Sequence, residues 1–316
     1  MRAKAYLVLL SAVAALVLAA GCSTSGSKPA PARPLRTSID SARVVLPAQT
    51  IGSFLVIEVK WDRYGPYRFL IDTGSSVTLM TPALAKRYPG WNAPGAYRRV
   101  LGPDGQAIDL PEASMRRLEM GGVRFDDVPV LLYDCAPFTS HLGVRIDGVL
   151  GFPLFREVLL TLDYPGSRVV IQRVKGAPET PGTAVSFEDP RKTPLVPVRL
   201  GDRTFVALID SGSDMTFSLN PVGLNPQFAY GPTVGPTIGS ISGDRTQRIG
   251  RLSETLTIGD YAFPQPIVDV SDELSAIGAG ALRHFAVTFD QMRDRVTFFR
   301  ESKEPIRIGG RRSAGV

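Results

Sequence analysis

Two short stretches share one pattern, and this pattern constrains the fold more than any other feature of the chain. FLIDTGSS begins at residue 69 and ALIDSGSD begins at residue 207. In each, an apolar run leads into an aspartate, Asp72 or Asp210, which a hydroxyl residue, a glycine and a second hydroxyl residue follow. The pattern predicts a buried strand that ends in a tight glycine turn, with hydroxyls that hydrogen-bond the turn. One such turn is common, but two in corresponding places indicate a pair of functional carboxylates.

The two halves of the chain also end alike. VLGFPLFREVLLTLDYPGSRVVI, from residue 149, aligns without a gap with AIGAGALRHFAVTFDQMRDRVTF, from residue 276, and places Asp163 on Asp290. A repeated unit predicts two similar lobes related by a pseudo-two-fold axis, which brings equivalent points together. We therefore expect Asp72 and Asp210 to meet at the interface between the lobes.

Composition favours an all-β fold. The 316 residues include 31 glycines and 26 prolines, and short alternating apolar runs between turn signals predict many strands. We predict an N-terminal lobe over residues 44–174, a linker over 175–192 with one strand near its end, a C-terminal lobe over 193–300 and a polar tail over 301–316. A hairpin around Gly102–Gly105 is the candidate flap, with Tyr97 near its base.

Residues 1–21 predict an export signal. Arg2 and Lys4 precede an almost unbroken apolar run, and Cys22 follows the small residue Gly21. The pattern resembles a bacterial lipoprotein signal, which implies cleavage before Cys22 and lipid on that residue. An ordinary secretory signal and a short membrane span are the alternatives. Ser23, by the same resemblance, implies an outer-membrane lipoprotein on the periplasmic or cell-surface side.

Residues 22–43 are rich in Ser, Pro, Gly and basic side chains and predict a solvated tether. The alternative is an inhibitory segment whose arginines, Arg33, Arg36 and Arg43, lie in an acidic cleft. With Cys22 lipidated, Cys135 has no disulfide partner, so we expect it to be a buried small apolar residue.

The paired motifs resemble the signatures of the aspartic peptidases, both pepsin-like and retropepsin-like. Residues 149–151 and 276–278 are similar to the hydrophobic-hydrophobic-glycine segment that lies beneath each signature in that family. The resemblance covers residues 44–300. It implies two homologous acid-protease-type β-barrel lobes with the active-site cleft between them.

The same resemblance implies a role for each motif residue. Asp72 and Asp210 are the expected catalytic pair, sharing one proton as pepsin-type pairs do. The expected supporting residues are Thr73, Gly74, Ser75, Ser211, Gly212 and Ser213. Thr73 and Ser211 would cross-link the two loops. Ser75 and Ser213 would hydrogen-bond the outer carboxylate oxygens. Asp214 stands where the first motif has Ser76, and we expect its charge to raise the pKa of a neighbour.

The implied function is a membrane-tethered aspartic endopeptidase, a monomer that cleaves peptide or protein substrates without cofactor or metal. With two histidines and no His-Glu-x-x-His sequence, the chain gives no signal for a zinc site. It also lacks a Gly-x-Ser-x-Gly elbow and a Gly-Lys-Ser/Thr phosphate loop. Removal of the predicted signal takes Arg2 and Lys4 from the net charge of +6, and the remaining +4 is mild and does not favour a nucleic-acid partner. The alternative function is a catalytically inactive peptide-binding lipoprotein that uses the same cleft.

Overall fold

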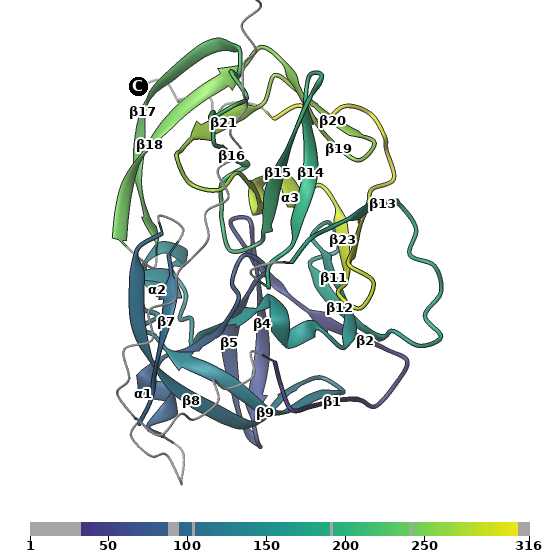
Figure 1. The fold of residues 1–316 in the computed structure, drawn as a ribbon. Helices are drawn as coiled ribbons and strands as arrows, with labels where there is room; N and C mark the ends of the chain where they lie inside the picture. The colour runs from purple at the N-terminus through teal and green to yellow at the C-terminus, as the bar shows by residue number, and fades with distance from the viewer. Residues whose placement is uncertain (1–32, 88–94, 103–104, 190–191, 241–242, 309–316) are drawn as a thin grey trace, which may run out of the picture. The chain divides into compact units, whose positions relative to one another are not determined.

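The structure is a computed structural model that describes residues 33–87, 95–102, 105–189, 192–240 and 243–308. The predicted signal and Cys22 lie outside these ranges. These described residues form one compact unit. Figure 1 shows that strands dominate its described part, so the all-β class is confirmed.

The first sheet has nine strands and carries the first motif. In ladder order it contains β1 (Arg36–Ile39), β9 (Val123–Leu132), β6 (Thr78–Met80), β10 (Gly148–Gly151), β5 (Tyr64–Asp72), β4 (Phe54–Trp61), β8 (Ala107–Met120) and β7 (Tyr97–Leu101), while β3 (Gln49–Ile51) pairs with β4. Strand β8 also pairs with β9. The candidate flap hairpin is therefore formed by β7 and β8.

The second nine-stranded sheet carries the second motif. Its order is β17 (Phe228–Ser240), β18 (Gly243–Leu252), β21 (Ile267–Val270), β16 (Phe217–Leu219), β22 (Ala276–Gly278), β15 (Arg203–Asp210), β14 (Leu195–Leu200), β19 (Thr255–Ile258) and β20 (Tyr261–Pro264). Strands β15 and β22 pair in parallel, as β5 and β10 do in the first sheet.

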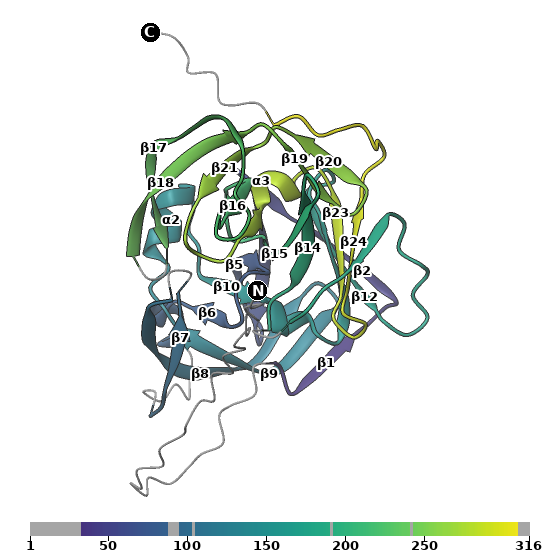
Figure 2. The same cartoon turned by 45° about the horizontal axis from the view of Figure 1, so that its top comes forward.

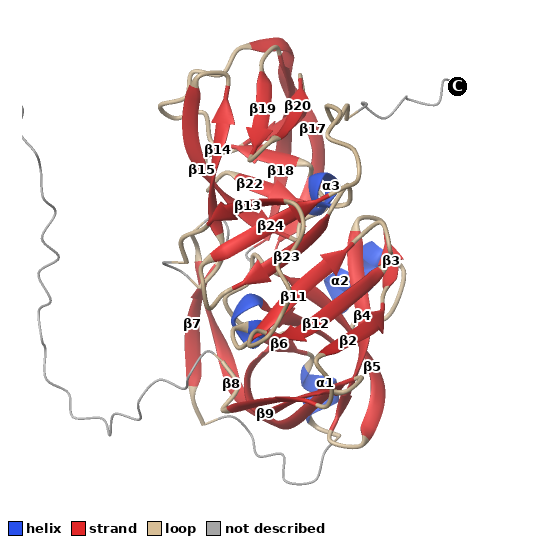
Figure 3. Ribbon diagram, turned by 90° about the vertical axis from the view of Figure 1, so that its right-hand side faces the viewer, coloured by secondary structure: helices blue, strands red, loops and turns tan. Residues whose placement is uncertain are grey.

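A six-stranded sheet combines strands from both ends of the chain. Its order is β13 (Thr183–Ser186), β24 (Arg295–Phe299), β23 (Ala286–Asp290), β11 (Val158–Asp163), β12 (Arg168–Arg173) and β2 (Arg43–Pro47). At its centre β11 and β23 run antiparallel, and the hydroxyls of Thr161 and Thr288 are 2.8 Å apart. These threonines are also equivalent in the sequence repeat, so the repeat coincides with a symmetric strand pairing. Figure 3 shows this sheet between β14 and β15 on one side and β8 and β9 on the other.

Helices are few and short. They are α1 (Pro82–Ala85), α2 (Ala136–Leu142), the 3-10 helix η1 (Phe152–Phe155) and α3 (Ala279–Leu282). Within the described ranges, no helix has the length and apolar character that crossing a bilayer requires.

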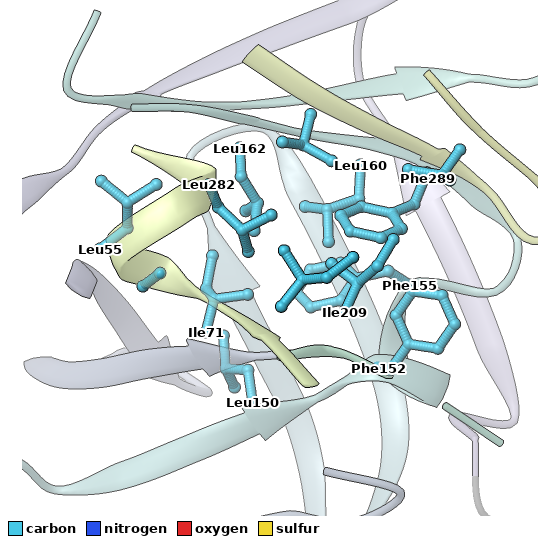
Figure 4. Packing of buried hydrophobic residues seen from close by; sticks show 14 of the residues in the cluster. Leu55, Ile71, Leu150, Phe152, Phe155, Leu160, Leu162, Ile209, Leu282 and Phe289 are labelled. Atoms are coloured by element: carbon cyan, nitrogen blue, oxygen red, sulfur yellow. The ribbon is translucent and has the colours of Figure 1, made fainter. Parts of the chain in front are cut away.

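One apolar core connects the three sheets. Figure 4 shows Ile71 from β5 and Ile209 from β15 directed into a cluster with Leu150, Phe152 and Phe289. The rings of Phe152 and Phe289 pack edge to face with centroids 5.4 Å apart. Because the residues that precede both aspartates belong to this core, the ends of β5 and β15 are fixed relative to each other.

The structure differs from the expected domain ends in two places. Within the predicted tether, Arg36–Ile39 forms β1 and pairs with β9, because backbone pairing at a sheet edge needs few apolar side chains. Within the predicted tail, Ile306 is buried and its N–H donates to the carbonyl of Ala262 at 2.8 Å. The described body therefore extends beyond residues 44–300 in both directions.

The arginines of the proposed inhibitory segment are held elsewhere. Arg33 pairs with Glu157 at 3.7 Å, and Arg36 and Arg43 lie on strands β1 and β2. No contact of these arginines with Asp72 or Asp210 is present in the described part of the chain, so the structure gives the inhibitory alternative no support.

Candidate active site

The two aspartates end equivalent strands. Asp72 is the last residue of β5 and lies opposite Gly151 on the parallel strand β10. Asp210 is the last residue of β15 and lies opposite Gly278 on β22. The hydrophobic-hydrophobic-glycine segments predicted to support the motifs are therefore the neighbouring strands of both aspartates.

Four hydrogen bonds between buried groups cross-link the two loops. The Thr73 hydroxyl donates to the carbonyl of Ile209 at 2.7 Å and accepts the N–H of Ser211 at 3.0 Å. Reciprocally, the Ser211 hydroxyl donates to the carbonyl of Ile71 at 2.8 Å and accepts the N–H of Thr73 at 2.9 Å. Both hydroxyl residues are buried. Figure 2 shows β5 and β15 next to each other near its centre. The structure thus brings the two motifs together as the sequence predicts.

The glycine of each motif packs against the carboxyl group of the other. A Cβ atom on Gly212 would lie 2.3 Å from Cγ of Asp72, and one on Gly74 would lie 2.5 Å from Cγ of Asp210. No side chain fits at such distances, so both positions require glycine. The two carboxyl groups therefore lie close together, and each affects the pKa of the other.

Backbone N–H groups orient both carboxylates. The N–H groups of Gly74 and Ser75 donate to Oδ1 of Asp72 at 2.8 and 3.1 Å. The N–H of Gly212 donates to Oδ1 of Asp210 at 2.9 Å. Each carboxylate is therefore held through one oxygen by its own loop.

Burial raises the pKa of both carboxyl groups. It is the largest cause for Asp72, and the charge of Asp210 and the hydrogen bond to it raise the pKa of Asp72 further, to well above its ordinary value. Burial also raises the pKa of Asp210, which the backbone bonds partly offset. The pair therefore keeps one proton at a pH where two separate carboxyls would have lost theirs. Both residues are partly exposed, so water reaches them.

Ser75 and Ser213 do not act as expected. The Ser75 hydroxyl donates to the carbonyl of Val77 at 2.8 Å, and the Ser213 hydroxyl accepts the N–H of Met215 at 3.4 Å. Neither hydroxyl bonds an aspartate within the described residues. The reason is local, because a serine in a turn readily bonds the backbone two residues further on.

Asp214 forms a contact outside the aspartate pair. Its Oδ2 atom lies 3.2 Å from Nε2 of His141 on α2, whose ring packs edge to face against Phe54. The charge of Asp214 is not among the causes that shift either catalytic pKa, so our expectation of like-charge repulsion was wrong. The contact between His141 and Asp214 left no sequence signal because 73 positions separate the two residues.

Tyr164 is a second residue that the sequence did not indicate. It is buried, and its hydroxyl has no hydrogen-bond partner among the described residues. Burial raises its pKa, and the charges of Asp210 and Asp72 add to this shift. Tyr164 therefore lies close enough to the pair to sense its charge.

The remaining predicted residues lie outside the pair. Cys135 is free and buried, and burial raises the pKa of its thiol to about 12, which agrees with a role as a small apolar residue. Tyr97 is exposed on β7, and the tip of the flap hairpin at residues 103–104 lies outside the described ranges.

A family model described as aspartyl protease matches residues 57–154. This range contains the first motif and strand β10, but not the second motif. No curated protein matches the chain. The family match supports an aspartyl protease family and a protease-type function, and it speaks for the first half of the chain alone.

Proposed function

We propose that the chain is an aspartic endopeptidase in which Asp72 and Asp210 are the catalytic residues. The observation that carries the proposal is the reciprocal set of hydrogen bonds between Thr73 and Ser211, which holds two carboxyl groups against each other. A protein that needed only the two turns would not require two partly buried carboxyl groups packed close together, because bringing such groups together costs free energy.

In the proposed mechanism the pair acts as one unit with one proton. The ionised carboxylate takes a proton from a water between the two groups, and the water oxygen attacks the carbonyl carbon of the peptide. The protonated carboxyl gives its proton to the carbonyl oxygen, which yields a tetrahedral intermediate. A proton then passes to the leaving nitrogen and the carbon–nitrogen bond breaks, so no covalent link to the enzyme forms.

The proposed architecture is two homologous acid-protease-type lobes, residues 44–174 and 193–300, with the linker 175–192 between them and the cleft at their interface. Two observations support it. Strands β5 with β10 and β15 with β22 pair alike around the aspartates, and Thr161 and Thr288 pair at equivalent positions of the repeat. The body resembles both pepsin-like and retropepsin-like proteins in this respect.

We further propose that the protein is a lipoprotein of the outer membrane, tethered through lipid on Cys22. The support is the basic, apolar and small-residue order of residues 1–22. Labelling cells with a radioactive fatty acid tests this point. We expect the wild-type chain to carry the label and Cys22→Ala to lose it, whereas label that persists in Cys22→Ala would contradict lipidation there.

The alternative function is a peptide-binding lipoprotein without turnover. Asp214, which stands where the first motif has Ser76, motivates this alternative. To separate the two functions, the full chain is incubated with an unfolded protein substrate from acidic to neutral pH, with and without a statine peptide that mimics the tetrahedral intermediate. Cleavage that the statine peptide blocks supports the endopeptidase. Binding of the statine peptide by a chain that cleaves at no pH supports the alternative.

A further inference from the structure

A cavity of about 320 Å³ lies on the first sheet, away from the aspartate pair. Three arginines line it from three separate segments of the chain, namely Arg68 on β5, Arg87 after α1 and Arg145 before β10. Two acidic residues, Glu58 on β4 and Asp147, complete its charged lining. The volume is within the range of small-molecule sites. Arginines that converge from separate segments on one cavity are an arrangement that suits an anion.

One of the three guanidinium groups is fixed in place. Asp147 is buried and its Oδ1 atom binds both Nε and Nη2 of Arg145, at 2.7 and 2.6 Å. The other oxygen of Asp147 accepts the backbone N–H of Arg68 at 3.1 Å. Asp147 therefore neutralises Arg145 and holds it at the cavity wall, while the remaining N–H groups of Arg145 stay free of that carboxylate.

The other two arginines form no ion pair within the described residues. Among the described residues, no carboxylate lies within ion-pair distance of Arg68 or Arg87. Glu58 faces Arg68 across the β4–β5 ladder but forms no ion pair with it. The lining therefore offers two unpaired guanidinium groups and one unpaired carboxylate.

We propose that this cavity, defined by Arg68, Arg87, Arg145, Asp147 and Glu58, is a binding site for a phosphate group. Guanidinium groups bind phosphate and carboxylate through paired N–H donors. A tetrahedral phosphate accepts bonds from several directions at once, which suits arginines that come from three segments, whereas a planar carboxylate is served by one or two. The phosphate group belongs to a small phosphorylated molecule or to a lipid headgroup.

The proposed site is independent of the peptidase proposal. Arg68 precedes Asp72 by four positions on β5, so about 13 Å of strand separates the two sites. Asp147 likewise stands just before β10, whose other end, Gly151, lies opposite Asp72. Phosphate binding and peptide cleavage can therefore be measured separately.

The test uses the full chain and isothermal titration calorimetry with three probes. Inorganic phosphate represents the small molecule, dihexanoyl phosphatidylglycerol below its micelle concentration represents the lipid headgroup, and acetate represents a carboxylate. Arg87→Gln is expected to weaken phosphate binding by about tenfold, because it removes charge-assisted hydrogen bonds. Glu58→Gln is expected to tighten binding, because it removes a repelling charge. Arg199→Gln is the matched control, since Arg199 is an exposed arginine of the second sheet outside the cavity.

The outcomes are distinct. Binding of phosphate at one site per chain, with opposite effects of Arg87→Gln and Glu58→Gln and no effect of Arg199→Gln, supports a site for a small phosphorylated molecule. The same variant pattern with the phospholipid probe, at higher affinity than inorganic phosphate, assigns the headgroup. Absence of binding by a folded chain, acetate binding as tight as phosphate binding, or equal losses in Arg87→Gln and Arg199→Gln would overturn the proposal.

Discussion

Thr73→Val tests whether the cross-links beneath the aspartates hold the two halves together. Valine has nearly the shape of threonine, so the substitution removes the hydroxyl and changes the packing little. Thr73 is fully buried, and its hydroxyl makes two hydrogen bonds to the opposite loop, one to the carbonyl of Ile209 and one from the N–H of Ser211. Both backbone groups lose this partner in the variant.

The expected cost follows from these two bonds. A buried N–H without a partner costs about 1–3 kcal/mol, and the lost bond to the Ile209 carbonyl adds about 1 kcal/mol. The variant should therefore lose about 2–4 kcal/mol of the free energy of unfolding, a large part of the typical total of about 5–15 kcal/mol. Catalytic turnover should fall as well, because the loops that carry the two carboxyl groups become less well fixed.

Urea denaturation followed by circular dichroism measures the loss of stability, with Thr73→Ser as the matched control. Serine keeps the hydroxyl, and the second motif already has Ser211 at the equivalent position, so Thr73→Ser should lose about 1 kcal/mol for the missing methyl group. If Thr73→Val and Thr73→Ser lose equal stability, the hydroxyl contributes nothing and the reasoning fails.

Three further predictions follow from the site. Gly212→Ala places a Cβ atom 2.3 Å from Cγ of Asp72, so peptide turnover should fall at least about 100-fold. Gly95→Ala, where a Cβ meets no atom of the described residues within 4 Å, should leave turnover unchanged, and equal turnover in both variants would contradict the close contact. Burial and Asp210 raise the pKa of Asp72 in the folded chain above its value in the unfolded chain. Between these two pKa values the folded chain binds more protons, so stability falls as pH rises through that window. In urea denaturation Asp72→Asn should therefore stabilise the chain more near neutral pH than at about pH 4, and an equal effect at both pH values would argue against a raised pKa. Asp214→Ser breaks an exposed contact with His141 and should change the free energy of unfolding by less than about 1 kcal/mol; a much larger loss would mean that this contact, too, holds the halves together.

The parts of the site that the sequence could predict are those encoded by local pattern and repetition. Asp72 and Asp210 each follow a buried strand and precede a glycine turn, and the repeat indicates that equivalent points meet. The cross-links of Thr73 and Ser211 lie within those same motifs. The all-β class follows from short alternating runs, such as FLVIEVKW on β4, where Glu58 and Lys60 alternate with buried residues.

The features that the sequence did not indicate depend on contacts between distant positions. His141 contacts Asp214, and Tyr164 lies near Asp72 and Asp210, because folding brings together residues that are far apart in the sequence. Strand β1 escaped prediction because its backbone, rather than an apolar pattern, attaches it to β9. The hydroxyl of Ser75 bonds the carbonyl of Val77 rather than an aspartate, because a serine in a turn readily bonds the backbone two residues further on.

The central claim is that Asp72 and Asp210 act together on one water, and the most direct measurement is turnover of an unfolded protein substrate by two single variants. Asp72→Asn and Asp210→Asn should each abolish cleavage while circular dichroism shows an intact fold, because each leaves the pair without one of its two carboxyl groups. Asp214→Asn, which changes a third aspartate next to the second motif, should still cleave. Cleavage that persists in Asp72→Asn or in Asp210→Asn would contradict the shared pair.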